Sequence, residues 1–226
     1  MLHGVPIALG YLSVSFGFGI LAVQSGLTVW QAVGISATNL TSAGQTAGVA
    51  IIAAAGSIVE MIFTQFVINL RYSLMALSLT QKLDGTFTTR RRMMIAFGIT
   101  DEIYAVAASQ PELLTASYME GLILTPMLGW IAGTLLGAAV GQVLPASVTD
   151  ALGILLYGMF IAIILPPCRK NSRLVWVILM AAAISVILTF FAPFISGGFA
   201  IIISAVVSAG IAALVFPVSE EEAEQP

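Results

Sequence analysis

The chain has 226 residues, of which 59% are hydrophobic and only 8% are charged, against about 25% charged residues in an average soluble domain. This composition excludes an ordinary soluble protein, and it also excludes a disordered chain, because disordered segments are polar and highly charged. We therefore expect an integral membrane protein.

Several chemistries are excluded by what the sequence lacks. One cysteine, Cys168, and one histidine, His3, cannot form a conventional Cys/His metal site or an internal disulfide. No phosphate-binding P-loop motif occurs. The net charge of -3, with basic residues confined to short loops, provides no surface for nucleic acid. We expect no metal, no other cofactor and no enzymatic activity.

Apolar runs separated by glycine, proline or charged residues give eight helical candidates of about the length that a bilayer crossing needs. They lie at residues 4–24, 29–55, 57–80, 93–109, 119–143, 150–166, 174–192 and 198–216. Transmembrane strands would instead show short segments of alternating polarity. We predict an all-α, polytopic transmembrane helix bundle of seven or eight membrane segments, some broken or re-entrant. It forms a single domain over residues 1–218, followed by an acidic, disordered tail at 219–226.

Glycines recur at small-xxx-small spacing in two of the predicted helices. They are Gly10, Gly17 and Gly19 in segment 4–24, and Gly129, Gly133, Gly137 and Gly141 in segment 119–143. Such faces let helix backbones approach closely in a membrane. We interpret them as packing faces. Tyr11 in the first segment is a candidate hydrogen-bond donor to a substrate, but tyrosines at segment ends are more often interface anchors, and we favour that interpretation.

Segment 29–55 is interrupted by hydrogen-bonding side chains, among them Asn39, Ser42 and Gln45. A helix broken here would expose backbone carbonyls and amides at mid-membrane depth, as discontinuous helices do at transporter substrate sites.

Segment 57–80 has polar side chains on two faces. One stripe falls within about 40° on a helical projection and consists of Glu60, Thr64, Arg71 and Ser78. Gln65 and Asn69 form a second polar pair. We therefore expect this helix to lie inside the bundle. Glu60 and Arg71 are about 16 Å apart along the axis, so Arg71 needs an acidic partner from elsewhere.

The basic loops at residues 82–92 and 169–173 are both expected on the cytoplasmic side. Three predicted helices lie between them, although two inside loops require an even number of crossings. The weakest of the three is 93–109, which has Asp101 and Glu102 at its centre. We expect this segment to be broken or re-entrant; the alternative is that one basic loop violates the rule.

Asp101 and Glu102 are the candidate partners of Arg71. Adjacent residues on a helix diverge by about 100°, so one acid can face Arg71 while the other faces water or a helix end. Two carboxylates with one guanidinium leave a surplus negative charge, and the less well paired carboxyl can carry a proton. The alternative is a buried ion network that only fixes the fold, although ionisable groups inside a membrane favour a functional role.

Four motifs resemble those of one family. They are Gly4-Val-Pro-Ile-Ala-Leu-Gly-Tyr11, Ser42-Ala-Gly-Gln45, Asn69-Leu-Arg71 with the following Tyr-Ser-Leu-Met-Ala-Leu-Ser-Leu, and Asp101-Glu102. They are similar to the AzlC family, the large subunits of branched-chain amino acid exporters. The resemblance implies export of valine, leucine and isoleucine, with methionine as a further candidate. It also implies a multi-pass protein of the cell inner (plasma) membrane and a small membrane partner of the AzlD type.

The sequence thus favours a proton-linked secondary exporter of branched-chain amino acids. The alternative is a non-transporting membrane scaffold or sensor whose charged residues only hold the bundle or a partner together. The residues we expect in substrate binding or proton coupling are Glu60, Gln65, Asn69, Arg71, Asp101, Glu102, Asn39, Ser42 and Gln45.

Overall fold

The computed structural model describes residues 2–141 and 171–216, together with positions 144, 145, 147, 158, 161, 164, 165, 168 and 169. Within these residues the fold is all-α, apart from an isolated bridge between Leu83 and Leu114. Apart from isolated positions, the helix predicted at 150–166 lies outside the described residues, as does the tail predicted at 219–226. The chain forms two compact units, Met1–Val49 with Ile68–Gly158 (unit 1) and Ala50–Val67 with Met159–Pro226 (unit 2).

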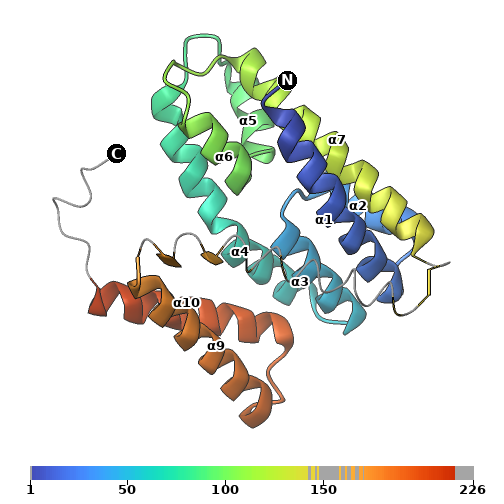
Figure 1. Cartoon of the computed structure of the whole chain (residues 1–226). Helices are drawn as coiled ribbons and strands as arrows, with labels where there is room; N and C mark the ends of the chain where they lie inside the picture. Colours follow the sequence, from blue (N-terminus) through green and yellow to red (C-terminus); the bar gives the residue numbers. More distant parts are fainter. Residues whose placement is uncertain are drawn as a thin grey trace. The chain divides into compact units, whose positions relative to one another are not determined.

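The helices follow the predicted apolar runs, with two exceptions (Figure 1). In chain order they are α1 (Gly4–Gln24), α2 (Val29–Thr38), α3 (Ser42–Ala53), α4 (Ile58–Leu79), α5 (Thr89–Phe97), α6 (Asp101–Ala108), α7 (Ala116–Val140), α9 (Arg173–Phe191) and α10 (Gly197–Val215). Of the described helices, five are long and apolar enough to cross a membrane, namely α1, α4, α7, α9 and α10. The exceptions are segments 29–55 and 93–109, which each form two shorter helices. Threonine side chains cap the N-termini of α2, α5, α6 and α7.

α1 and α7 pack closely side by side along their length (Figure 1). A Cβ atom at Gly137 would lie 2.0 Å from the carbonyl oxygen of Phe16, and one at Gly133 would lie 2.3 Å from that of Leu12. The contacts advance by four residues in the same direction on both helices, so α1 and α7 are parallel. This confirms the packing interpretation for the α7 glycines. Gly10 has no atom within 4 Å of its Cβ position and is not part of this contact.

The chain enters α5 and leaves α6 at the same end of unit 1. Lys82 Nζ, before α5, donates hydrogen bonds to the carbonyl oxygens of Ala108 (2.6 Å) and Gln110 (2.8 Å), after α6. The backbones of the two connecting segments are also bonded, from Leu114 N to Lys82 O at 2.7 Å and from Asp84 N to Leu114 O at 3.0 Å. α5 and α6 therefore follow the path expected of a broken, re-entrant segment.

α2 and α3 form a second pair of short helices separated by a break. Val49 of α3 belongs to one buried apolar cluster with Leu27 and Ala32 at the start of α2, and with Phe18 and Ala22 of α1. Val49, in the part of α3 that belongs to unit 1, thus lies near the start of α2, at the end of unit 1 where α1 finishes. Because α7 begins at the opposite end, beside α6, the two broken pairs enter unit 1 from opposite ends.

The part of α4 in unit 1 is less enclosed than the sequence predicts. Leu70, Leu74 and Leu77 lie on one face and are exposed, because this third face of the helix is apolar and packs against nothing in the described part of unit 1. The stripe residues Arg71 and Ser78 nevertheless bind side chains of α6. α4 therefore presents its polar face to α6 and an apolar face outward.

Candidate functional site

The break between α2 and α3 is held by buried side chains. Asn39 has an extended backbone, and its N–H still donates to Ile35 O at the end of α2. The Gln45 amide donates to the carbonyl oxygen of Asn39, and Trp130 Nε1 on α7 donates to Gln45 Oε1 at 3.2 Å. Gln45 and Trp130 are almost fully buried. The carbonyl freed by the break is thus satisfied inside the protein, as a membrane interior requires.

Two of the predicted site residues meet at this break. The Thr41 hydroxyl donates to Asn69 Oδ1 on α4, and Thr41 N–H donates to Asn39 Oδ1 at 3.1 Å. Ser42 is the first residue of α3, and its carbonyl oxygen accepts a hydrogen bond from Thr46 Oγ1 at 2.9 Å. Thr41, which our list of site residues omits, therefore links Asn39 to Asn69.

The second break separates α5 from α6 at residues 98–100. A Cβ atom at Gly98 would lie 2.1 Å from the side chain of Ile123 on α7, so glycine allows the chain to turn against α7. Thr100 then caps α6 by accepting a backbone hydrogen bond at 3.4 Å. Asp101 and Glu102 occupy the first turn of α6, where the helix dipole favours negative charge.

Arg71 pairs with Asp101, which confirms that an acid from segment 93–109 is its partner. Arg71 Nη2 lies 3.1 Å from Asp101 Oδ2, and the two side chains are 43% and 24% exposed. The same nitrogen donates to the Tyr72 hydroxyl at 2.8 Å, and the guanidinium lies 4.8 Å from the Tyr72 ring centroid. Both charged groups can therefore be reached from outside the chain.

Glu102 is bound by Tyr11 instead. The Tyr11 hydroxyl donates to Glu102 Oε2 at 2.6 Å and is also hydrogen-bonded to Thr100 Oγ1. Because the single Tyr11 proton goes to Glu102, the Thr100 hydroxyl must donate to Tyr11. The Tyr11 ring also contacts Trp130 edge to face, with centroids 5.2 Å apart.

The interpretation of Tyr11 as an interface anchor is therefore wrong, because its side chain is buried. The sequence feature that indicates a buried tyrosine is the position of Tyr11 inside the apolar run 4–24, because anchoring tyrosines lie at the ends of such runs.

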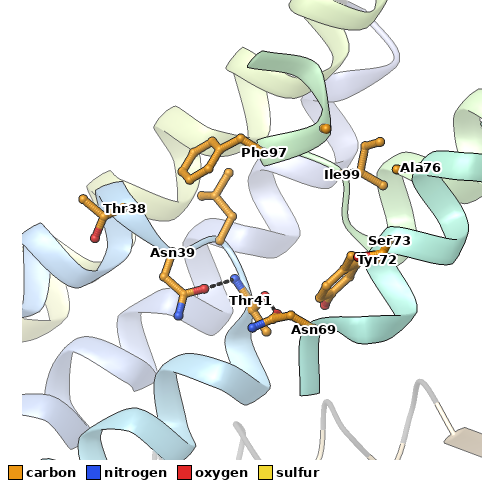
Figure 2. A pocket seen from close by; sticks show the side chains of 11 residues that line it. Thr38, Asn39, Thr41, Asn69, Tyr72, Ser73, Ala76, Phe97 and Ile99 are labelled. Atoms are coloured by element: carbon orange, nitrogen blue, oxygen red, sulfur yellow. Dashed lines mark hydrogen bonds between the residues drawn. The ribbon is translucent and has the colours of Figure 1, made fainter. Parts of the chain in front are cut away.

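A cavity of about 360 Å³ lies between the two breaks and α4, within the usual range for ligand pockets. It is lined by Thr38, Asn39, Leu40, Thr41, Asn69, Tyr72, Ser73, Ala76, Ala96, Phe97 and Ile99. Figure 2 shows Asn39, Thr41 and Asn69 close together, with Phe97 and Ile99 across the opening. The Arg71–Asp101 pair adjoins this cavity through Tyr72.

Glu60 and Gln65 belong to unit 2. The Glu60 side chain is 4% exposed, and its Oε1 accepts a hydrogen bond of 2.8 Å from Gly198 N–H at the N-terminus of α10. The nearby Thr64 hydroxyl is buried and finds no hydrogen-bond partner among the described residues. Gln65 Nε2 lies 3.9 Å from the sulfur of Met61.

The sequence matches a family model described as AzlC protein over residues 6–144. It is 30% identical over 112 residues to an uncharacterized membrane protein of Archaeoglobus fulgidus, covering 50% of this chain and 48% of that protein. It is 28% identical over 106 residues to the inner membrane protein YgaZ of Escherichia coli, covering 47% of this chain and 43% of that protein. An uncharacterized membrane protein of Helicobacter pylori is 29% identical over 104 residues, 46% of this chain and 45% of its own length. The matches thus span about half the length of these curated relatives. No solved structure matches.

Proposed function

The chain belongs to the AzlC family, and we propose that it is a secondary transporter that exports branched-chain amino acids across the cell inner membrane. Its substrates are valine, leucine and isoleucine, with methionine as a further one. Family membership and the membrane-protein relatives support a transporter-like role. The observation that carries the proposal is the cavity between two helix breaks, because discontinuous helices form the substrate sites of many secondary transporters.

The groups around the cavity suit a zwitterion with an apolar side chain. Such a substrate needs a cation or a helix N-terminus for its carboxylate, an acid or carbonyl groups for its ammonium, and an apolar pocket. Arg71 and Asp101 supply the two charges, and Asn39 and Asn69 supply amide groups. The bound amino acid replaces the Arg71–Asp101 contact by one ion pair to each residue, so that charge is balanced in the empty and in the loaded site.

Glu102 is our candidate for the coupling proton. Arg71 neutralises Asp101, and Glu102 is held only by neutral hydroxyl groups in the described structure, directly by Tyr11 and through it by Thr100. Glu102 thus has no cationic partner among the described residues, and it lies at the contact between α1 and α6. A proton placed on Glu102 Oε2 would make this oxygen the donor to Tyr11, and so would link the protonation state to the contact between α1 and α6.

The exporter is proposed to act as a multi-pass protein together with a small AzlD-type membrane subunit. In this topology α5–α6 is re-entrant from the cytoplasmic side, where the basic loop 82–92 is expected. The exposed apolar face of α4, with Leu70, Leu74 and Leu77, lies against lipid or against that subunit.

Counterflow of labelled leucine tests the site. The chain is reconstituted with its small subunit into vesicles, and Arg71→Gln and Asp101→Asn are compared with Arg91→Gln. Arg91 forms another ion pair of unit 1, 3.2 Å from Glu120 and similarly exposed, and serves as a matched control. Each site variant removes one of the two charges that pair with the bound amino acid, and a hydrogen bond to a charged group contributes ~1.5–3 kcal/mol. We therefore expect the two site variants to lose at least about tenfold in rate at low leucine concentration, and the control to stay near normal. Normal rates in the site variants would contradict the assignment.

A further inference from the structure

A second cavity adjoins the first along α4 and α5. It has a volume of about 260 Å³, and both cavities are lined by Ser73, Ala76, Ala96 and Ile99. These four residues therefore form a shared wall. Two of them, Ala76 on α4 and Ala96 on α5, have no side-chain atom beyond Cβ, so the wall is thin at these two positions.

The two cavities differ in chemistry. The first carries the amide and hydroxyl groups of Asn39, Thr41 and Asn69. The second is lined mainly by apolar side chains. Leu79, Phe87, Ile95 and Met119 form its buried side, and the exposed residues Leu77, Thr80 and Arg92 lie at its open side. An aliphatic amino acid has the same division, with a zwitterionic head and a hydrocarbon side chain.

We propose that the second cavity receives the side chain of the amino acid whose head group occupies the first, and that Ala76 and Ala96 determine which side chains are accepted. This assignment rests on the proposed function and adds the residues that determine the substrate specificity. Small residues at these two positions leave room for a branched or a long aliphatic side chain to pass between α4 and α5. The methyl group of alanine would be too short to reach the apolar lining, so alanine gains little from the second cavity.

The expected preference for leucine over alanine follows from the contribution of apolar contacts to binding in a pocket. One methylene group more or less changes specificity about 10-fold or more, and leucine has three more carbon atoms than alanine. We therefore expect leucine to be favoured over alanine by at least about tenfold in the unaltered protein. A larger side chain in the shared wall should remove most of this preference without changing recognition of the head group.

The test measures how well unlabelled leucine, valine, methionine and alanine compete with labelled leucine, in vesicles containing the chain and its small subunit. Ala76→Val, Ala76→Leu and Ala96→Leu are compared with Ala105→Leu. Ala105 is an exposed alanine of α6 that lines neither cavity, so it controls for the added bulk. Ala76→Leu and Ala96→Leu should lower the preference for leucine over alanine about tenfold, Ala76→Val should lower it less, and the control should keep the normal preference.

Three outcomes would overturn the inference in distinguishable ways. A preference unchanged in all cavity variants would refute the role of the wall and leave the proposed transport function standing. Equal loss of leucine and alanine recognition, in variants that still elute as folded protein, would show that the wall does not discriminate by side chain. Absence of leucine competition in the unaltered chain would refute the proposed function itself, and the inference with it.

Discussion

The glycines of α7 allow α1 to pack against it, and replacing Gly137 by alanine should separate the two helices. The new Cβ atom would lie 2.0 Å from the carbonyl oxygen of Phe16, whereas ordinary contacts begin at 3.4 Å. The backbones must therefore move apart by about 1.4 Å, because neither contacting group is the end of a flexible side chain. A gap of 0.5–1 Å already loses about a quarter to a half of each dispersion contact, and overpacking typically costs ~1–3 kcal/mol.

The assay is thermal unfolding in detergent, followed by loss of helical signal or by aggregation. A loss of 1 kcal/mol lowers the midpoint by about 2–4 °C in a chain of this size. Gly133→Ala, with Leu12 O at 2.3 Å, should behave similarly, whereas Gly129→Ala, with Ala8 O at 2.6 Å, should cost less. Gly10→Ala is the matched control, because its Cβ position is open. A Gly137→Ala protein as stable as Gly10→Ala would refute the close packing of α1 on α7.

The remaining predictions concern Tyr11 and the glycine beside Glu60. Tyr11→Phe removes the donor to Glu102 at 2.6 Å, a bond worth ~1.5–3 kcal/mol when the acceptor is charged. Leucine efflux should persist but respond less to an imposed pH gradient, and an unaltered response would show that the hydrogen bond between Tyr11 and Glu102 takes no part in coupling. Gly198→Ala brings a Cβ atom to 2.6 Å from Glu60 Oε1, whereas the Cβ position of Gly197 is open. Only Gly198→Ala should lower the unfolding midpoint; identical midpoints for the two variants would argue against the buried Glu60 contact.

Helices that are apolar throughout can be predicted closely from composition and length. α1 begins and ends at residues 4 and 24 as predicted, and α9 and α10 differ from prediction by one residue at each end. The break in segment 29–55 is indicated by its polar side chains and lies among them, between Thr38 and Ser42, but the contacts that hold it depend on distant side chains. Gln45 satisfies the freed carbonyl of Asn39, and Gln45 is itself held by Trp130, 85 positions further along the chain.

The candidate site is predictable in its charges but not in its geometry. A guanidinium among apolar residues needs a counter-charge, which is why an acidic partner for Arg71 can be inferred from sequence. Which of the two adjacent acids pairs with it depends on the rotation of α6 and on Tyr11, 91 positions before Glu102. The cavity depends on the meeting of two breaks, and no local pattern specifies that meeting.

The most direct test of the proposed transport function is counterflow of labelled leucine by the unaltered chain, in vesicles with and without the small AzlD-type subunit. We expect labelled leucine to accumulate in vesicles that hold both subunits, and unlabelled valine, isoleucine and methionine to compete with it. Absence of flux under both conditions, at every imposed pH gradient, would contradict transport and favour a membrane scaffold or sensor.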